Sequence, residues 1–178
     1  MPEPDVEDAL GPEPADEAPG SPTIEAAHFR SVLGHYATGV TIITAEHEGK
    51  PYGLAANSFT SVSLDPPLVS VNVDQQAVMH QHMARAERFA INVLESRQEA
   101  LSRRFAEEHP DRFDGVGYRL TEGGFPHLDG AHAVLECVRH IAFVAGDHTI
   151  VIGEVTGGVV GEGRPLLYYR GGYYDLPA

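Results

Sequence analysis

A chain of 178 residues with 42% hydrophobic residues is long enough for one domain with a substantial apolar core, and its composition is that of an ordinary globular protein. Its formal net charge of −14 repels nucleic acids and anionic lipids, and no segment approaches the roughly 18 apolar residues of a membrane span, so neither partner is expected. The single cysteine, Cys137, cannot form an internal disulfide, and no secretory signal is visible, so we expect a cytoplasmic protein.

The first 22 residues differ in composition from the rest of the chain. They contain seven acidic residues and six prolines but neither lysine nor arginine. Such a segment cannot bury enough apolar surface to offset the entropy lost on ordering. We therefore expect a disordered acidic tail over 1–22 and one folded domain over 23–178. The tail increases solubility in the simplest interpretation and docks a partner in the alternative one.

Hydrophobic periodicity predicts few helices and many strands after the tail. In chain order the expected elements are a helix from Thr23 to Gly39, strands over 40–45, 52–59 and 68–73, a helix over 76–87, a strand over 89–94, a helix over 96–108, and strands over 133–144, 149–160 and 166–169. Most of these strands follow one another through short turns. This order favours an antiparallel barrel over a parallel doubly wound sheet.

Local signals mark where several of these elements begin and end. Thr23 is a suitable cap for the first helix, and the Ser96 to Glu99 spacing is a capping pattern for a later one. The segments 48–50 and 146–148 have turn composition. Asp65-Pro66-Pro67 cannot continue a hydrogen-bonded ladder, so it separates two strands.

Common catalytic motifs are missing from the sequence. It contains no phosphate loop, no Gly-x-Gly-x-x-Gly opening a helix and no Gly-x-Ser-x-Gly elbow, so a nicotinamide dinucleotide is not expected in a Rossmann crevice. His80 and His82 suggest half a metal site, but residues at i and i+2 on a helix point apart. No metal is therefore expected. Cys137 lies in an alternating strand and is expected to be an inert core residue.

Two short segments have the composition of a ligand site. Asn57 to Ser63 is rich in hydroxyl and amide groups, which suit a ligand with carbonyls, ring nitrogens and phosphate. Thr38-Gly39-Val40 contains a glycine that lets the backbone approach a flat ligand closely. Each segment also has a purely structural interpretation, as a strand end making turn hydrogen bonds and as a helix stop.

These segments belong to a series of motifs in a fixed order. The most specific part is the Ser58-Phe59-Thr60-Ser61 to Asp65-Pro66-Pro67-Leu68 block, followed at a distance by Gly146-Asp147-His148. The other members are Phe29-Arg30, Thr38-Gly39-Val40-Thr41, Gly53, Leu101 with Phe105, Leu135-Glu136-Cys137 and Gly153-Glu154-Val155. From about residue 28 to about residue 176 the chain resembles the short-chain flavin reductases, the reductase components of two-component flavin-dependent monooxygenases.

The resemblance implies a fold and an activity. The fold is a mainly β, antiparallel split β-barrel of the flavin reductase or FMN-binding type, with a few helices, that forms a homodimer with flavin near the subunit boundary. The activity is NAD(P)H-dependent hydride transfer to FAD or FMN, with free reduced flavin supplied to a partner monooxygenase. No basic cluster for a ribose phosphate is apparent, which favours NADH over NADPH.

The resemblance also assigns residues to the flavin. Thr38, Gly39 and Val40 are expected to line the isoalloxazine ring, with Asn57 and Ser58 hydrogen-bonded to its polar edge. Thr60 and Ser61 are expected to face the ribityl chain and phosphate, with Phe59 in the same segment. The residues expected near the tail or adenine are Phe105, Arg112 and Phe113.

Two further residues are assigned to the nicotinamide side. His148 matches the position beside the nicotinamide, where it can hold the carboxamide or donate a proton; as an isolated residue it would be interpreted as a turn histidine. The run from Tyr168 to Tyr173 matches a segment that covers the site, with Tyr173 as the preferred contact. No nucleophile or dedicated base is needed, because the cofactors carry the chemistry.

The chain departs from the family at positions associated with phosphate. Ala55 stands where the family often has Thr, and Ala77 and Met79 stand where it has Ser and Thr, with Asp74 nearby. These departures leave FAD and FMN as alternatives. Two other hypotheses remain: a tight flavin-binding carrier or sensor without turnover, and a scaffold that contacts an oxygenase through the acidic tail.

Overall fold

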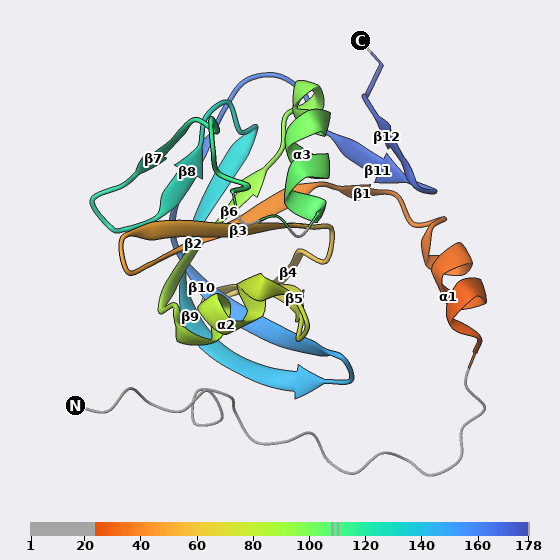
Figure 1. Ribbon diagram of the computed structural model, residues 1–178, viewed down its shortest axis with the longest axis horizontal. Coiled ribbons are helices and arrows are strands. Elements are labelled where there is room, and N and C mark those ends of the chain that lie inside the picture. Colours follow the sequence, from red (N-terminus) through yellow and green to blue (C-terminus); the bar gives the residue numbers. More distant parts are fainter. Residues whose placement is uncertain (1–23, 108, 110, 178) are drawn as a thin grey trace.

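The computed structural model describes residues 24–107, 109 and 111–177 (Figure 1). The predicted tail over 1–22 and the proposed cap Thr23 lie outside these residues. The elements are α1 (Ala26–Leu33), β1 (Thr38–Gly39), β2 (Thr41–His47), β3 (Lys50–Ala56), β4 (Thr60–Leu64), β5 (Pro67–Asp74), α2 (Val78–Arg85), β6 (Arg88–Val93), the 3₁₀ turn η2 (Ser96–Gln98), α3 (Glu99–Ala106), β7 (Tyr118–Leu120), β8 (Pro126–Leu128), β9 (Ala133–Ala145), β10 (His148–Val160), β11 (Leu167–Tyr169) and β12 (Gly172–Tyr174).

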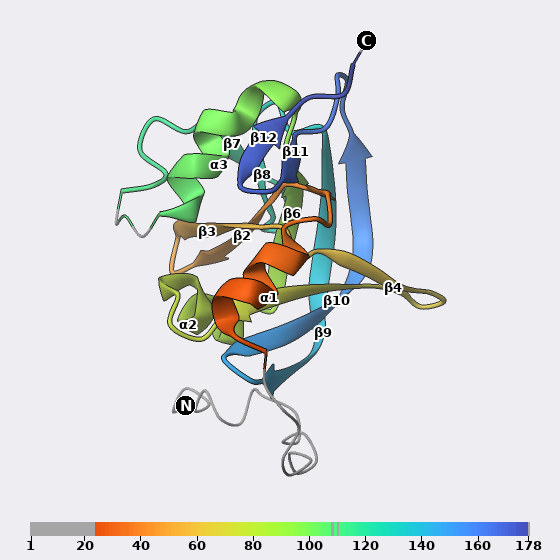
Figure 2. The ribbon, with the colours of Figure 1, turned by 90° about the vertical axis from the view of Figure 1, so that its right-hand side faces the viewer.

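A seven-stranded antiparallel sheet forms the body of the molecule. Its strand order is β3-β2-β6-β9-β10-β5-β4, so β3 and β4 are the two edges. These edge strands are consecutive in the chain and are joined only by residues 57–59. Because so short a link must connect both edges, the sheet curls back toward itself (Figures 1 and 2). The predicted mainly β, antiparallel fold is confirmed.

Two smaller sheets lie against this body. Strand β1 pairs with β11, and β11 pairs with β12, so the C-terminal hairpin is attached to the segment that precedes β2. Strands β7 and β8 form a separate hairpin. In Figure 1 this hairpin, α3 and the β11–β12 hairpin lie above β2 and β3, whereas α2 lies below them.

The sheet has apolar packing on both sides of β2. Ile43 and Ala45 face a cluster that includes Val71, Phe89 and Cys137. Ile42 faces a second cluster, in which Phe105 of α3 packs with Leu94, Leu128 and Leu166. The first five residues of β2 are buried on both faces of the sheet, which explains why Ile42 and Ile43 are both apolar although they point to opposite sides. Cys137 is fully buried, as predicted, and burial raises the pKa of its thiol to about 12.

The ends of two predicted helices differ from the sequence prediction. Helix α1 ends at Leu33 with Gly34 as its C-cap, not at Gly39, because Thr38 and Gly39 pair with Tyr168 and Leu167. Its N-cap is Glu25 rather than Thr23. The cap of the η2 turn that leads into α3 is Glu95 rather than Ser96: the Glu95 carboxylate accepts from the backbone of Arg97, and the Gln98 side chain accepts from the backbone of Glu95. The Arg97 hydrogen bonds lower the pKa of Glu95 to about 2.

Several short strands were not predicted. Residues 60–64, expected as a polar ligand segment, form β4, and the Gly-rich region contains β7 and β8. Strand β12 follows the last predicted strand. Three-residue strands have no periodicity to detect, so only their tertiary partners define them. Pro67 begins β5, where a strand tolerates proline.

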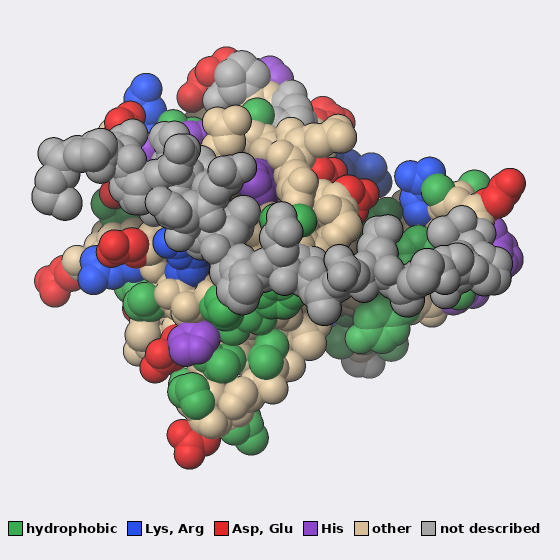
Figure 3. Space-filling model, turned by 90° about the horizontal axis from the view of Figure 1, so that it is seen from below, with side chains coloured by type: hydrophobic (Ala, Val, Ile, Leu, Met, Phe, Trp, Pro, Cys, Tyr) green, Lys and Arg blue, Asp and Glu red, His purple; other side chains and the backbone are tan. Residues whose placement is uncertain are grey.

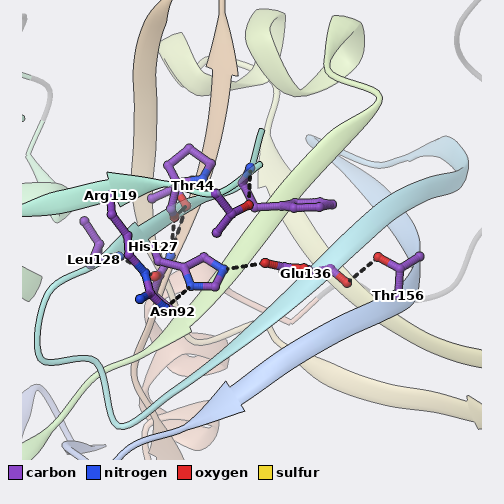
Figure 4. A network of polar contacts seen from close by, with 10 residues as sticks. Thr44, Asn92, Arg119, His127, Leu128, Glu136 and Thr156 are labelled. Atoms are coloured by element: carbon purple, nitrogen blue, oxygen red, sulfur yellow. Dashed lines mark hydrogen bonds and ion pairs between the residues drawn. The ribbon is translucent and has the colours of Figure 1, made fainter. Parts of the chain in front are cut away.

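A buried polar network fixes the β7–β8 hairpin to the sheet (Figure 4). Asn92 of β6 donates to the Thr44 hydroxyl and accepts from the backbone of Leu128, and Thr44 donates to the carbonyl of Pro126. The His127 ring, 4% exposed, lies 2.9 Å from the Glu136 carboxylate through Nε2 and 3.3 Å from Arg119 through Nδ1. Because arginine only donates, Nδ1 accepts and the ring proton lies on Nε2.

Within the described residues, no helix has the length and apolar character needed to cross a bilayer.

Candidate functional site

A cavity of about 210 Å³ opens between the end of β3, helix α3 and the C-terminal hairpin. We call it the α3 cavity. Its lining residues come from four segments distant in sequence: Val40, Ala55, Ala56, Asn57, Ser102, Ala106, Tyr168 and Tyr173. Two segments predicted to hold the ring, Thr38–Val40 and the start of Asn57–Ser61, are therefore brought to one place.

The pairing of β1 with β11 builds one wall of the α3 cavity. Thr38 is paired with Tyr168, which lines the cavity. The Thr38 hydroxyl is buried and has no hydrogen-bond partner. A Cβ placed on Gly39 would meet no atom within 4 Å. An unpaired buried hydroxyl beside open backbone fits a bound polar, flat group, because an unmade buried hydrogen bond is costly.

Helix α3 supplies the facing wall. Its residues Ser102 and Ala106 line the cavity, and the Ser102 hydroxyl lies 2.9 Å from the hydroxyl of Tyr173. The Arg103 guanidinium lies 4.8 Å from the centre of the Tyr173 ring. The sequence prediction included Tyr173 but missed Ser102 and Ala106. The one signal available was their position on the helix that carries Leu101 and Phe105.

Polar residues after Asn57 have mainly internal partners or face outward. The Ser58 hydroxyl donates to the backbone carbonyl of Asn72 and accepts from the backbone N–H of the same residue. It therefore completes the edge of β5 beyond the end of β4. Phe59 packs against the core. Thr60 and Ser61 are exposed on β4. Neither cavity described here is lined by Ser58, Phe59, Thr60 or Ser61.

A larger cavity of about 740 Å³ lies at the free edge of β3. We call it the β3-edge cavity. It is lined by Lys50, Pro51, Tyr52, Gly53, Val78, Met79, His109, Asp111, Arg112, Phe113 and Asp114. The predicted residues Arg112 and Phe113 are thus in one cavity, whereas Lys50 and Tyr52 were not predicted. The two cavities are neighbours, since Gly53 lines one and Ala55 the other.

Arg112 and Phe105 hold the wall of the β3-edge cavity. Arg112 donates to the carbonyl of Gly53 at 2.7 Å, on the edge of β3. Phe105, predicted near the flavin tail, is 1% exposed and lines neither cavity. It packs edge-on against Phe113 at 4.9 Å between ring centres and occupies the space beside Gly53. Its position supports the cavity from behind.

His148 lies apart from both cavities. It begins β10, where it pairs with Asp74 of β5, and its side chain is 41% exposed. Its Nδ1 lies 2.7 Å from the Asp147 carboxylate, and this hydrogen bond lowers the pKa of Asp147. Because a carboxylate only accepts, Nδ1 donates the proton of this hydrogen bond.

The histidines of α2 have separate partners. The His80 ring lies 2.8 Å from the Thr149 hydroxyl, and burial lowers its pKa. The His82 ring stacks on Tyr52 with 3.3 Å between ring centres. Among the residues that the structure describes, no three His, Cys, Asp or Glu side chains are grouped to hold a metal ion.

Comparison with known proteins relates this architecture to one family. Residues 33–177 match the family described as "Flavin reductase like domain". The chain is 45% identical over 157 residues to a flavin reductase of Pseudomonas putida, covering 87% of this chain and 92% of that protein. It is 38% identical over 159 residues to the reductase subunit HsaB of a flavin-dependent monooxygenase from Mycobacterium tuberculosis, covering 88% and 85%.

A solved structure agrees with these sequence relationships. The NADH:FAD oxidoreductase of Streptomyces globisporus, in complex with NAD and FAD fragments, superposes with a TM-score of 0.81 at 42% identity. The superposition covers 85% of this chain and 92% of that one. The predicted split β-barrel architecture is confirmed by this match.

Proposed function

Because the chain belongs to the flavin reductase-like domain family, we propose that it is an NADH-dependent flavin reductase that supplies reduced flavin to a partner monooxygenase. The observation that carries the proposal is the α3 cavity, where Val40, Asn57 and Tyr173 meet. Next to this cavity, Thr38 pairs with the lining residue Tyr168 and has an unpaired hydroxyl, and the open space at Gly39 suits a flat ring.

In this proposal the residues of the α3 cavity bind and orient the flavin, and the cofactors themselves carry out the reaction. A bound flavin accepts a hydride from the nicotinamide, so the chain needs to supply neither a nucleophile nor a base. The side-chain amide of Asn57, which lines the cavity, is a donor toward the polar edge of the ring. Fixed donors of this kind stabilise negative charge without reorganising. The side chains of Tyr168 and Tyr173 exclude water from one side of the bound ring.

The β3-edge cavity receives the extended part of the flavin in this proposal. Its lining combines cations, Lys50 and Arg112, with the aromatic rings of Tyr52 and Phe113. Phosphate is attracted by cations, and a purine stacks on aromatic faces. Ala77 and Met79 cannot supply hydroxyl donors, so Lys50 and Arg112 would carry the phosphate contacts. FAD and FMN both remain substrates under this proposal.

His148 holds the nicotinamide in the proposal, from a second copy of the chain. Within one chain His148 is separated from the α3 cavity, since it lines neither cavity and lies on the far side of β5 from Ser58. A homodimer can bring the two surfaces together across the subunit boundary. Exposed apolar side chains on α1 and on the outer face of β9 support such an assembly.

An aerobic assay that crosses NADH and NADPH with FAD, FMN and riboflavin tests the function. The proposal expects NADH oxidation that depends on added free flavin and is faster than NADPH oxidation. A carrier would instead purify yellow, keep its flavin on dialysis and show no turnover. A scaffold would show neither property, and deletion of residues 1–22 would abolish oxygenase coupling. Absence of flavin-dependent NADH oxidation would reject the proposal.

A further inference from the structure

Ser102 is unusual among the polar residues of α3. Its side chain is 1% exposed, although it lies on a surface helix whose Arg103 and Glu99 side chains are largely in solvent. The hydroxyl faces the α3 cavity and lies 2.9 Å from the phenol oxygen of Tyr173. A buried hydroxyl that makes a hydrogen bond costs little, whereas an unpaired one is costly. The pair therefore stabilises the contact between α3 and the C-terminal hairpin.

Tyr173 depends on side-chain contacts for its position. It lies in the three-residue strand β12, which pairs only with β11. Short strands at the edge of a small sheet have low local stability. The Tyr173 ring is contacted by Arg103 at 4.8 Å and by Tyr168 at 5.3 Å. The hydrogen bond with Ser102 adds a directional contact at the phenol end of the ring, on helix α3.

We infer that Ser102 is a positioning residue for flavin binding, which holds the Tyr173 hydroxyl so that the C-terminal hairpin forms a wall of the α3 cavity before the ligand arrives. This inference rests on the proposed function. A wall fixed in advance lowers the entropy lost on binding, so it affects affinity for flavin more than the rate of hydride transfer. Ser102 acts through Tyr173.

The helix itself does not require the serine. Alanine has a higher helix propensity than serine, and the neighbouring residues Leu101 and Phe105 supply the apolar packing of this turn. Ser102→Ala is therefore expected to leave α3 intact and to remove only the contact with Tyr173. The reciprocal variant Tyr173→Phe removes the same hydrogen bond from the other side.

The test compares Ser102→Ala, Tyr173→Phe and the double variant in steady-state assays with NADH and FAD. Each single variant is expected to raise the Michaelis constant for FAD roughly threefold to tenfold, the value of about one hydrogen bond, with kcat changed less than about twofold. The double variant is expected to be no worse than either single one, since both remove one interaction. Ser102→Thr keeps a hydroxyl and should restore much of the affinity. Tyr174→Phe, on the exposed side of β12, is the matched control and should leave the constant unchanged.

Hydrogen exchange without flavin gives a readout independent of catalysis. Amides of Leu167 to Tyr174 should exchange faster in Ser102→Ala and Tyr173→Phe than in wild type, while amides of β2 should not change. If both variants keep wild-type exchange and the wild-type Michaelis constant, the inference is wrong although the proposed function stands. If wild type shows no NADH oxidation with flavin, the proposed function fails, and unchanged exchange in both variants then overturns the role of Ser102 separately.

Discussion

Gly39 and Gly53 differ in how much space surrounds them. A Cβ on Gly39 would meet no atom within 4 Å, so this glycine borders open space. A Cβ on Gly53 would lie 2.8 Å from the Phe105 ring and 3.2 Å from the carbonyl of Ile43. The first glycine leaves room for a ligand, and the second leaves room for the core.

Alanine substitutions at these two positions should therefore have different effects, one on FAD binding and the other on the free energy of unfolding. Gly39→Ala is expected to keep the free energy of unfolding and to weaken FAD binding roughly tenfold, about 1.4 kcal/mol, because the methyl group enters the ligand space. Gly53→Ala is expected to lower the free energy of unfolding by about 1–3 kcal/mol through overpacking. Urea unfolding and FAD fluorescence titration measure the two effects. Unchanged FAD binding in Gly39→Ala would remove Thr38–Val40 from the ring site.

His148 has a defined protonation pattern even though it lies outside both cavities. The Asp147 carboxylate only accepts, so Nδ1 donates the proton of this hydrogen bond. His148→Ala should raise the Michaelis constant for NADH roughly threefold to tenfold or slow hydride transfer, with FAD affinity nearly unchanged. Stopped-flow reduction and an FAD titration on the same variant distinguish these effects. Loss of FAD affinity with normal hydride transfer would show that His148 serves the flavin.

At the scale of elements, the β7–β8 hairpin depends on a histidine that must stay neutral. Burial lowers the pKa of His127, and the neighbouring Arg119 lowers it further, while Glu136 opposes them (Figure 4). The hairpin also contacts the β3-edge cavity, because Tyr118 of β7 packs edge-on against Phe113 at 5.5 Å. Release of the hairpin would therefore loosen one wall of that cavity.

His127 and His80 predict how the free energy of unfolding changes in acid, because burial lowers the pKa of both rings. Because the pKa of His127 and of His80 in the folded state lies below the ordinary histidine value of about 6.5, the unfolded chain binds more protons. Stability is therefore full above about pH 6.5 and is lost as pH falls below that value. Urea unfolding should give a lower free energy at about pH 5.5 than at about pH 7.5. His127→Gln should reduce this difference, with His80→Gln as the matched comparison. An equal difference in wild type and in both variants would contradict the assignment.

At the scale of the whole molecule, several large apolar side chains are exposed to solvent on the surface of the single chain. Phe29, Val32 and Leu33 share one face of α1 by their spacing, and each is 48–53% exposed; Tyr36, in the turn after the helix, is 75% exposed. On the outer face of the sheet, Ile141 is 42% exposed beside partly buried Ile152. Figure 2 shows the β4–β5 hairpin projecting from the sheet, and Figure 3 shows hydrophobic side chains gathered below the centre of its view. Contiguous apolar surface of this kind marks interfaces.

Charge placed on α1 should therefore dissociate the proposed homodimer. Leu33→Asp is expected to give monomers and to raise the Michaelis constants for both substrates, because His148 then loses its partner cavity. Ser31→Asp adds the same charge on the opposite side of α1 and should leave the dimer intact. Sedimentation velocity measures the association state. A monomeric wild-type protein with full activity would show that one chain holds a complete site.

The sequence by itself determined the fold class and the family. Long strands such as β9 and β10 have enough alternation to be predicted, and the Ser58–Ser61 and Gly146–His148 motifs identify the flavin reductases before any contact is known. Cys137 as an inert core residue also followed from pattern alone. Each of these properties depends on local order along the chain.

Only the tertiary structure decided which residues share a cavity. Tyr168 lines the α3 cavity because β1 pairs with β11, a contact between segments far apart in the sequence. Ser102 lines it because helix α3 packs on β3. Phe105 moved from the predicted ligand contacts to the packing behind them, because Gly53 leaves space for its ring. Ser58, predicted to hydrogen-bond the flavin, instead hydrogen-bonds the backbone of Asn72 at the edge of β5. Long-range pairing and side-chain packing are collective, so no local pattern specifies them.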